Sequence, residues 1–256
     1  MSPTQIAMQY QHLAGSRFGK SSIIMVVTLI PWLWNCKEEE EATYPIEPNI
    51  ENAKVKFIKG ESEFSGDTLE ITLIYTDGDG NVGLDHNNPE HRSPPFHEFT
   101  FFHRSTGEAI TSDKLETDQV LYEDLISYDD RKYPPFDTLP SFSDCHYARG
   151  LYAVRNRNFS NLELLFLRKD NNGNWVQYEF EQECIFLNAR IPTIGTRNIV
   201  FEVKPLSRGR VEVVSKFISS EWVRIFAGNI LKLKLKIEDR NLNSSNYLLT
   251  DDFIIQ

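Results

Sequence analysis

The sequence predicts an all-β protein, an antiparallel sandwich that follows a separate N-terminal segment. Short stretches in which apolar and polar residues alternate recur along the chain, and such alternation is typical of half-buried strands. Turns rich in Asp, Asn and Gly separate these stretches, as they do in sandwiches. Hydrophobic residues make up 40% and charged residues 25% of the chain, which is the composition of a globular protein.

Residues 1–35 have the pattern of a secretory signal peptide. The residues up to Lys20 are polar, with Arg17 and Lys20 as their only charges, and the apolar run Ser21–Leu33 follows. This run is shorter than the ~20 apolar residues that a membrane-spanning helix needs, and Pro31 would disturb such a helix. We therefore expect a signal peptide, with a permanent transmembrane anchor as the alternative.

The next residues resemble the cleavage and lipidation site of bacterial lipoproteins. Leu33-Trp34-Asn35-Cys36 is similar to a lipobox, although Trp34 and Asn35 depart from the small residues that usually precede the lipidated cysteine. The acidic run Glu38–Glu41 resembles the tag that directs some Gram-negative lipoproteins to the cell surface, with a solvated linker as the alternative. The resemblance implies a lipid on Cys36 that anchors the chain to the bacterial outer membrane, either surface-exposed or periplasmic.

Residues 36–52, with Pro45 and Pro48, are predicted to tether the lipid to one domain over residues 53–256. The strands predicted for this domain are Lys54–Ile58, Thr68–Thr76, Leu162–Arg168, Trp175–Phe180, Asn198–Lys204, Arg210–Phe217, Leu231–Ile237 and Leu248–Ile255. The clearest is Leu231–Ile237, where apolar residues alternate with lysines, which predicts one buried and one solvated face. Asn172-Gly173 favours a tight turn that joins the third and fourth strands into a hairpin.

Residues 86–150 form the least regular part of the sequence and are predicted to be a long insertion between core strands. Ser93–Phe96 and Tyr133–Phe136 each contain a Pro-Pro pair, which favours extended polyproline geometry. Leu115–Ile126 is predicted to form a short helix. The aromatic residues of the insertion either provide a contact surface or fold back onto the sandwich.

Two segments resemble uncharacterised lipoprotein families of Gram-negative bacteria that have immunoglobulin-like folds. They are Ile74–Asp85 (IYTDGDGNVGLD) and Leu235–Ile255 (LKIEDRNLNSSNYLLTDDFII). The resemblance implies an Ig-like antiparallel sandwich, with Thr68–Thr76 as its second strand and Leu231–Glu238 as its sixth. Both strands would run toward the same end, so the loops after them would lie side by side.

These two loops contain oxygen-bearing side chains of the kind that Ca²⁺ prefers. The candidate calcium ligands are Asp77, Asp79, Asn81, Asp85, Asp239, Asn241 and Asn243. Plain turns are the favoured alternative, because Asp, Asn and Gly are the common turn residues. The EF-hand pattern is not met, since Val82 stands where its invariant glycine belongs.

Four histidines near the start of the insertion suggest a second kind of metal site. They are His86, His91, His97 and His103, with Asp85, Glu90 and Glu98 close to them in sequence. Zinc uses imidazole and carboxylate together, so a metal-dependent hydrolase is the alternative function. Their spacing contains no helical pair of zinc ligands, and solvated or backbone-bonded loop histidines are the favoured interpretation.

Cys145 and Cys184 remain once Cys36 carries a lipid. In an oxidising export compartment they could form a disulfide, which would contribute about 4 kcal/mol by the chain-entropy argument. Free buried thiols are the alternative.

The sequence nominates no catalytic residues, because it contains neither a G-x-S-x-G elbow nor an S-x-x-K nucleophile motif. A net charge of −10 also argues against nucleic-acid binding, which needs a basic surface. The favoured function is a non-enzymatic binding module with a protein or glycan partner. A purely structural envelope protein is a further alternative.

Overall fold

The computed structural model describes residues 45–61, 66–116, 120–129, 145, 147–180, 187–207 and 209–256. The chain divides into residues 1–42 and 43–256, and every described residue belongs to the second unit. The predicted signal peptide, Cys36 and Glu38–Glu41 lie outside the described residues, as does Cys184. Within the described ranges, no helix combines the length and the apolar character that crossing a membrane requires.

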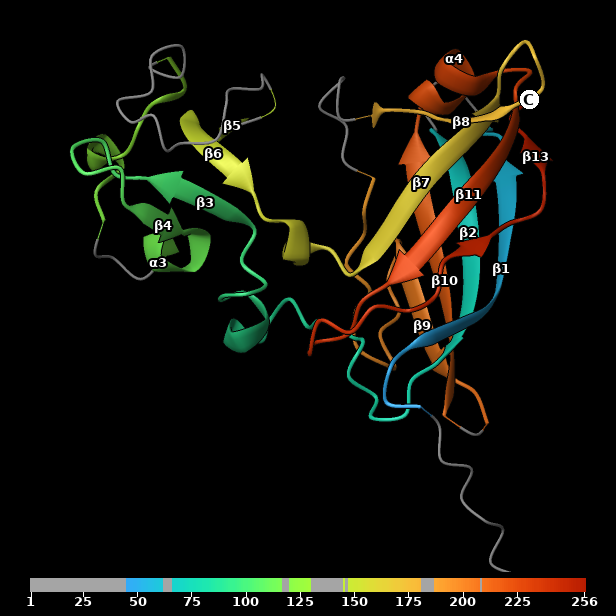
Figure 1. Ribbon diagram of the computed structural model, residues 1–256, viewed down its shortest axis with the longest axis horizontal. Coiled ribbons are helices and arrows are strands. Elements are labelled where there is room, and N and C mark those ends of the chain that lie inside the picture. The colour runs from blue at the N-terminus through green and yellow to red at the C-terminus, as the bar shows by residue number, and fades with distance from the viewer. Residues whose placement is uncertain are drawn as a thin grey trace, which may run out of the picture. The chain divides into compact units, whose positions relative to one another are not determined.

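The first sheet has four antiparallel strands in the order β1-β2-β10-β9 (Figure 1). They are β1 (Asn49–Ile58), β2 (Asp67–Thr76), β10 (Arg210–Ser219) and β9 (Phe201–Pro205). In β2 every second residue from Leu69 to Tyr75 is buried, as the alternating sequence predicts. β1 begins within the predicted tether. β9 begins at Phe201 because Asn198 Oδ1 accepts hydrogen bonds from two following backbone N–H groups and forms a turn there.

The second sheet has the order β12-β11-β7-β8, and β13 also pairs with β11. Its strands are β12 (Leu248–Leu249), β11 (Ile230–Ile237), β7 (Leu162–Lys169), β8 (Trp175–Gln177) and β13 (Phe253–Ile254). The last predicted strand is split in two. Thr250 lies between its halves and is buried, and its Oγ1 accepts from Leu233 N at 2.9 Å in place of a backbone carbonyl. The predicted hairpin β7–β8 forms, although β8 ends at Gln177 and not at Phe180.

The inner faces of the two sheets enclose one hydrophobic core. Leu69, Ile71 and Leu73 from β2 pack in it with Leu231, Leu233 and Leu235 from β11. Each fully buried side chain of this kind contributes about 1.5–3 kcal/mol relative to exposure. The helix α4 (Glu221–Phe226) closes the core, because the rings of its Trp222 and Phe226 stack on Phe166 at centroid distances of 5.7 and 5.6 Å.

The strand order is that of an immunoglobulin-type sandwich, which confirms the predicted fold. In chain order the strands are A (β1), B (β2), C (β7), C′ (β8), D (β9), E (β10), F (β11) and G (β12 and β13). One sheet is then A-B-E-D and the other G-F-C-C′. β2 and β11 are the second and sixth core strands if C′ is not counted, as the resemblance implied.

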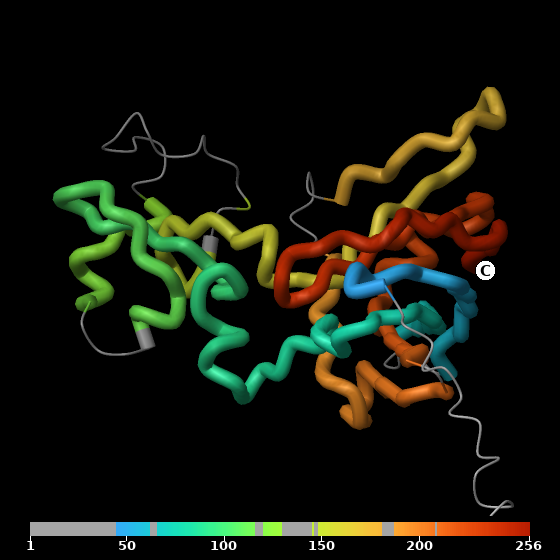
Figure 2. The backbone as a smooth tube through the Cα atoms, turned by 60° about the horizontal axis from the view of Figure 1, so that its bottom comes forward, coloured from blue at the N-terminus to red at the C-terminus, as the bar shows by residue number. Residues whose placement is uncertain are grey.

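The insertion lies between strands B and C, and it is more regular than the sequence predicts. Figure 2 shows the chain leaving the sandwich after β2 and returning as β7. Between them lie the short helices η1 (Pro89–His91) and η4 (Arg157–Phe159) and a third antiparallel sheet, in the order β4-β3-β6-β5. Its strands are β3 (Phe99–Phe102), β4 (Ala109–Thr111), β5 (Tyr147–Ala148) and β6 (Leu151–Arg155). We call residues 99–155 the inserted unit.

The inserted unit has its own hydrophobic core. Phe101 packs there with Leu125 and Leu151, and the Phe102 ring lies 5.5 Å from that of Tyr152. These phenylalanines therefore fold inward rather than forming a contact surface. The helix predicted over Leu115–Ile126 is wrong in extent: α3 spans Ser112–Glu116, the short η2 helix spans Tyr122–Asp124, and Leu125 and Ile126 lie buried beyond it.

Candidate functional site

The loops that follow strands B and F lie side by side at one end of the sandwich. Arg240, in the F–G loop, donates to the carbonyl oxygen of Asn81 in the B–C loop, from its backbone N at 3.2 Å and from its Nε at 2.9 Å. The two loops are therefore adjacent, as predicted. All of the candidate calcium ligands belong to these two loops.

The turn after β2 folds back on itself around Asp77. This residue is only 5% exposed, and its Oδ2 accepts from Val82 N at 3.0 Å. Gly80 adopts φ +68°, a left-handed conformation that favours glycine and lets the chain reverse. Asn81 is 8% exposed, and its Nδ2 donates to Asp79 Oδ2 at 2.7 Å. Asp77, Asp79 and Asn81 are thus brought together.

Two buried oxygen atoms of this turn have no hydrogen-bond partner among the described residues: Asp77 Oδ1 and Asn81 Oδ1. Leaving such an atom unsatisfied costs about 1–3 kcal/mol. Burial raises the pKa of Asp77 to about 6. The backbone N–H groups of Val82 and Asn81 oppose this shift, and the hydrogen bond to the Asp79 side chain and the charge of Asp79 add to it. Burial also raises the pKa of Tyr75, and the negative charge of Asp77 adds to this effect.

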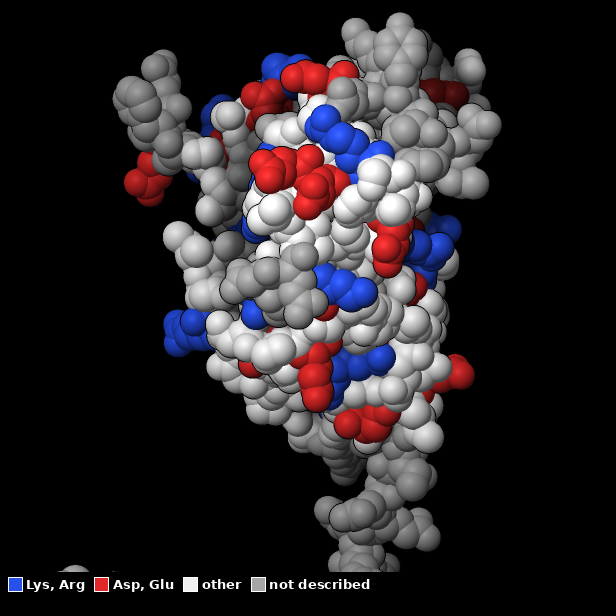
Figure 3. Space-filling model, turned by 90° about the vertical axis from the view of Figure 1, so that its left-hand side faces the viewer, with Lys and Arg blue, Asp and Glu red and all other residues white. Residues whose placement is uncertain are grey.

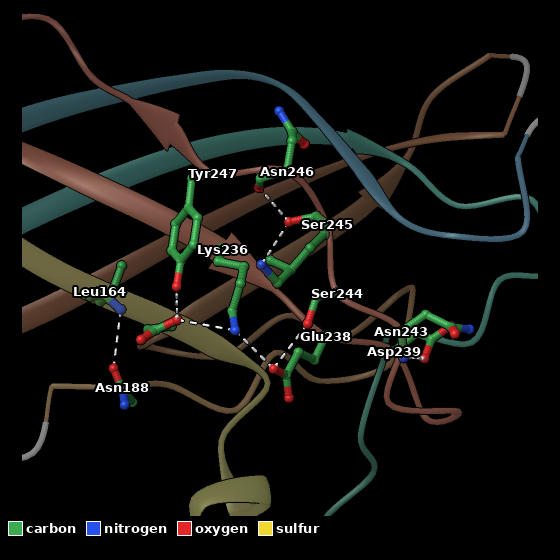
Figure 4. Close-up of polar contacts among 12 residues, drawn as sticks. Leu164, Asn188, Lys236, Glu238, Asp239, Asn243, Ser244, Ser245, Asn246 and Tyr247 are labelled. Carbon is green, nitrogen blue, oxygen red and sulfur yellow. Dashed lines mark hydrogen bonds and ion pairs between the residues drawn. The ribbon is translucent and has the colours of Figure 1, made fainter.

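The other predicted calcium ligands are used differently. Asp239 is fully buried, and both of its carboxylate oxygens accept from Asn243, from the backbone N at 2.7 Å and from Nδ2 at 2.8 Å (Figure 4). Asp85 Oδ1 accepts from Asn87 N at 2.8 Å, and Asn241 is exposed. These residues have the contacts of ordinary turns, so only Asp77, Asp79 and Asn81 of the candidates converge.

The four histidines of the insertion do not come together. His91 is buried, with Asp85 N donating to its Nδ1 at 2.8 Å and Arg240 Nη1 at 3.1 Å from its Nε2. Burial and then the charge of Arg240 lower the pKa of His91. His97 contacts Thr100 Oγ1 at 3.0 Å, while His103 bonds within its own turn and His86 is exposed. Over the described ranges, no three His, Cys, Asp or Glu side chains are grouped to hold a metal ion.

Sequence reasoning missed the residues that fasten the insertion to the sandwich. Buried Asn161, just before β7, donates to the carbonyl oxygen of Val82 and accepts from Ile191 N at 2.6 Å. Arg190 donates to the carbonyl oxygens of His91 and Phe159. No local pattern in the sequence marks these side chains, because their partners lie far away along the chain.

Asn156 joins the two ends of the inserted unit. Its Nδ2 donates to the carbonyl oxygens of Pro95 at 2.6 Å and of His97 at 2.8 Å. Its backbone N donates to the carbonyl oxygen of Glu98 at 2.9 Å. The segment before β3 and the segment after β6 therefore lie next to each other.

A polar cluster on the G-F-C face contains Lys236, which is buried although the alternating pattern predicted a solvated lysine. Its Nζ lies 2.9 Å from Glu238 Oε1 and 3.3 Å from Glu163 Oε2, and Tyr247 Oη donates to Glu163 at 3.1 Å (Figure 4). Burial alone would lower the pKa of Lys236, but the two glutamates raise it above its ordinary value. We interpret this group as a structural ion-pair cluster.

Cys145 is disulfide-bonded, and its partner lies outside the described residues. The predicted pairing with Cys184 therefore stays a prediction.

Comparisons with protein-family models, with curated proteins and with solved structures found no match to this chain. The fold and its loops define the class of protein: an Ig-like β-sandwich that carries a third, small sheet between strands B and C.

Proposed function

We propose that this chain is an exported bacterial lipoprotein, anchored to the outer membrane through Cys36, whose Ig-like domain is a non-enzymatic binding module. The observation that supports a binding role is the inserted unit. It has a hydrophobic core of its own and lies between strands B and C, at the end of the sandwich where Ig domains carry binding loops. The inserted sheet takes the place of a loop and adds surface to a rigid scaffold. Binding residues of proteins are commonly found on such loops.

The surface of the inserted unit suggests a protein or glycan partner. Leu121 is 61% exposed and Tyr122 is 49% exposed, and the two lie next to each other at η2. Tyrosine is enriched among the residues that dominate binding energy at protein interfaces. Figure 3 shows basic and acidic side chains interspersed over one face, and no large patch of basic residues appears among the described residues on that face. A nucleic-acid partner is therefore not favoured.

Lipidation is tested by metabolic labelling with a palmitate analogue in a Gram-negative host. Wild type should take up the label and Cys36→Ser should not, because only the cysteine can carry the lipid. Label that persists in Cys36→Ser would contradict the anchor. Protease treatment of intact cells then separates the two locations, since only a surface-exposed chain is cleaved.

Binding is tested by screening the full chain against glycan and extracellular-protein arrays. The double variant Leu121→Ala with Tyr122→Ala should weaken any hit by roughly tenfold or more, as expected when central contact residues are truncated. The matched control is Ile218→Ala, which removes a similarly exposed apolar side chain from β10 of the sandwich. A screen without hits, or a loss equal to that of the control, would favour the purely structural alternative.

A further inference from the structure

The turn after β2 contains an arrangement that turn formation does not explain. Asp77 and Asn81 are each more than nine-tenths buried, and each has one side-chain oxygen without a hydrogen-bond partner among the described residues. Both side chains approach the same neighbour, the carboxylate of Asp79. The Asp79 carboxylate therefore lies close to both the Asp77 carboxylate and the Asn81 amide, and no donor of the described chain hydrogen-bonds to Asp77 Oδ1 or Asn81 Oδ1.

Other turns of the same composition show what a plain turn does with these residues. In the β7–β8 hairpin, Asp170 Oδ1 accepts from Asn172 N at 2.9 Å and from Asn174 N at 2.8 Å, and its Oδ2 accepts from Asn174 Nδ2. In the same way, both carboxylate oxygens of Asp239 accept hydrogen bonds from Asn243. In both turns the aspartate accepts hydrogen bonds with both of its oxygens, whereas Asp77 accepts from Val82 N with Oδ2 and its Oδ1 has no hydrogen-bond partner among the described residues.

We propose that Asp77, Asp79 and Asn81 form a divalent-cation site and that calcium is its ligand. A cation at this place would bind Asp77 Oδ1 and Asn81 Oδ1 and would neutralise the two adjacent carboxylates. All three ligands are oxygen atoms, which hard cations prefer, and no histidine or cysteine contributes. Calcium fits better than magnesium, because it accepts irregular geometry and completes its coordination with water.

The site would act on the binding end of the domain. The backbone carbonyl of Asn81 already accepts two hydrogen bonds from Arg240 of the F–G loop, and the next residue, Val82, is held by Asn161, which directly precedes strand C. A cation on the side chain of Asn81 would fix the B–C loop against both neighbours. With two carboxylates, one of them exposed, we expect an affinity of about 10⁻⁴–10⁻³ M, in the range of extracellular calcium modules.

The test is the melting temperature of the full chain, stripped with EDTA and then titrated with calcium or magnesium at constant ionic strength. About 10 mM calcium should raise the melting temperature by roughly 3–10 °C, because a ligand that binds only the native state stabilises it by mass action. Magnesium should have a smaller effect. Isothermal titration calorimetry should give one site per chain.

The variants locate the site. Asp77→Asn and Asp79→Asn should each abolish the calcium-induced rise, whereas the matched control Asp170→Asn should keep it in full. If Asp77→Asn does not fold, Asp79→Asn decides alone, because Asp79 is exposed and its replacement does not disturb the core. No calcium response in wild type would overturn the proposal, and so would an undiminished response in both site variants. These outcomes are independent of lipidation and of partner binding, so the site and the proposed function can fail separately.

Discussion

Replacing Asp77 by asparagine should stabilise the protein when no divalent cation is present. In the folded chain, burial and the charge of Asp79 raise the pKa of Asp77 to about 6, from 3.8 for an unperturbed aspartate. Each pKa unit corresponds to about 1.4 kcal/mol, so ionised Asp77 costs roughly 2–3 kcal/mol of the free energy of unfolding at neutral pH. Asparagine removes the charge and keeps an oxygen that can accept from Val82 N.

The pH dependence follows from the direction of this shift. Between pH 4 and pH 6 the folded state holds the Asp77 proton more tightly than the unfolded state, so the contribution of Asp77 to stability falls as pH rises through this window. The neighbouring titratable groups that interact with it are Asp79, on the same turn, and Tyr75. The difference in unfolding free energy between Asp77→Asn and wild type should therefore grow from about pH 4 to about pH 6.5 and then level off.

Urea unfolding in EDTA, followed by tryptophan fluorescence at several pH values, measures this difference. Asp170→Asn is again the control and should show no gain at neutral pH, because several hydrogen bonds hold the pKa of Asp170 below its ordinary value. An Asp77→Asn variant that is less stable than wild type at neutral pH, or a difference that does not change with pH, would refute this argument. With calcium present, the difference in unfolding free energy between Asp77→Asn and wild type should become smaller or change sign, since calcium stabilises only wild type.

Three further predictions concern the sandwich, each measured by urea unfolding. Leu233→Ala should lose about 2–5 kcal/mol, because it opens a cavity at a fully buried position between the sheets. Asn161→Ala should lose about 2–4 kcal/mol, since it leaves two buried backbone groups without partners; a loss below ~1 kcal/mol would contradict its linking role. Lys236→Met should lose about 1–2 kcal/mol at neutral pH, because it leaves two partly buried glutamates without their lysine partner. The control for Lys236→Met is Lys232→Met, which removes a lysine paired with the exposed Asp252 and should change stability by less than ~0.5 kcal/mol.

The sandwich could be predicted from the sequence because its long strands have one buried and one wet face. β2 and β11 each alternate along most of their length, and a period of two sustained over so many residues is typical of a half-buried strand. The strands of the inserted unit are two to five residues long. Alternation cannot be detected over so few residues, and pairing such as Phe99 with Arg155 depends on contacts between distant parts of the chain.

The candidate site could be predicted only in part, for a different physical reason. The sequence names Asp77 and Asp239 on equal terms, because each opens a turn that contains asparagine. Their difference lies in whether the following residues present donors to the second carboxylate oxygen, which depends on the conformation of the turn. Arg240 and Asn81 are 159 positions apart, so no local pattern could connect them.

The closed base of the inserted unit has a consequence for how this protein can vary. Since Asn156 joins the backbone at Pro95, His97 and Glu98, the chain enters the inserted unit and leaves it at nearly the same point. The chain between strands B and C therefore passes through this closed base, whatever is built beyond it. We therefore expect that inserted units of different size or specificity can be exchanged at this position without altering the packing of the two sheets of the sandwich.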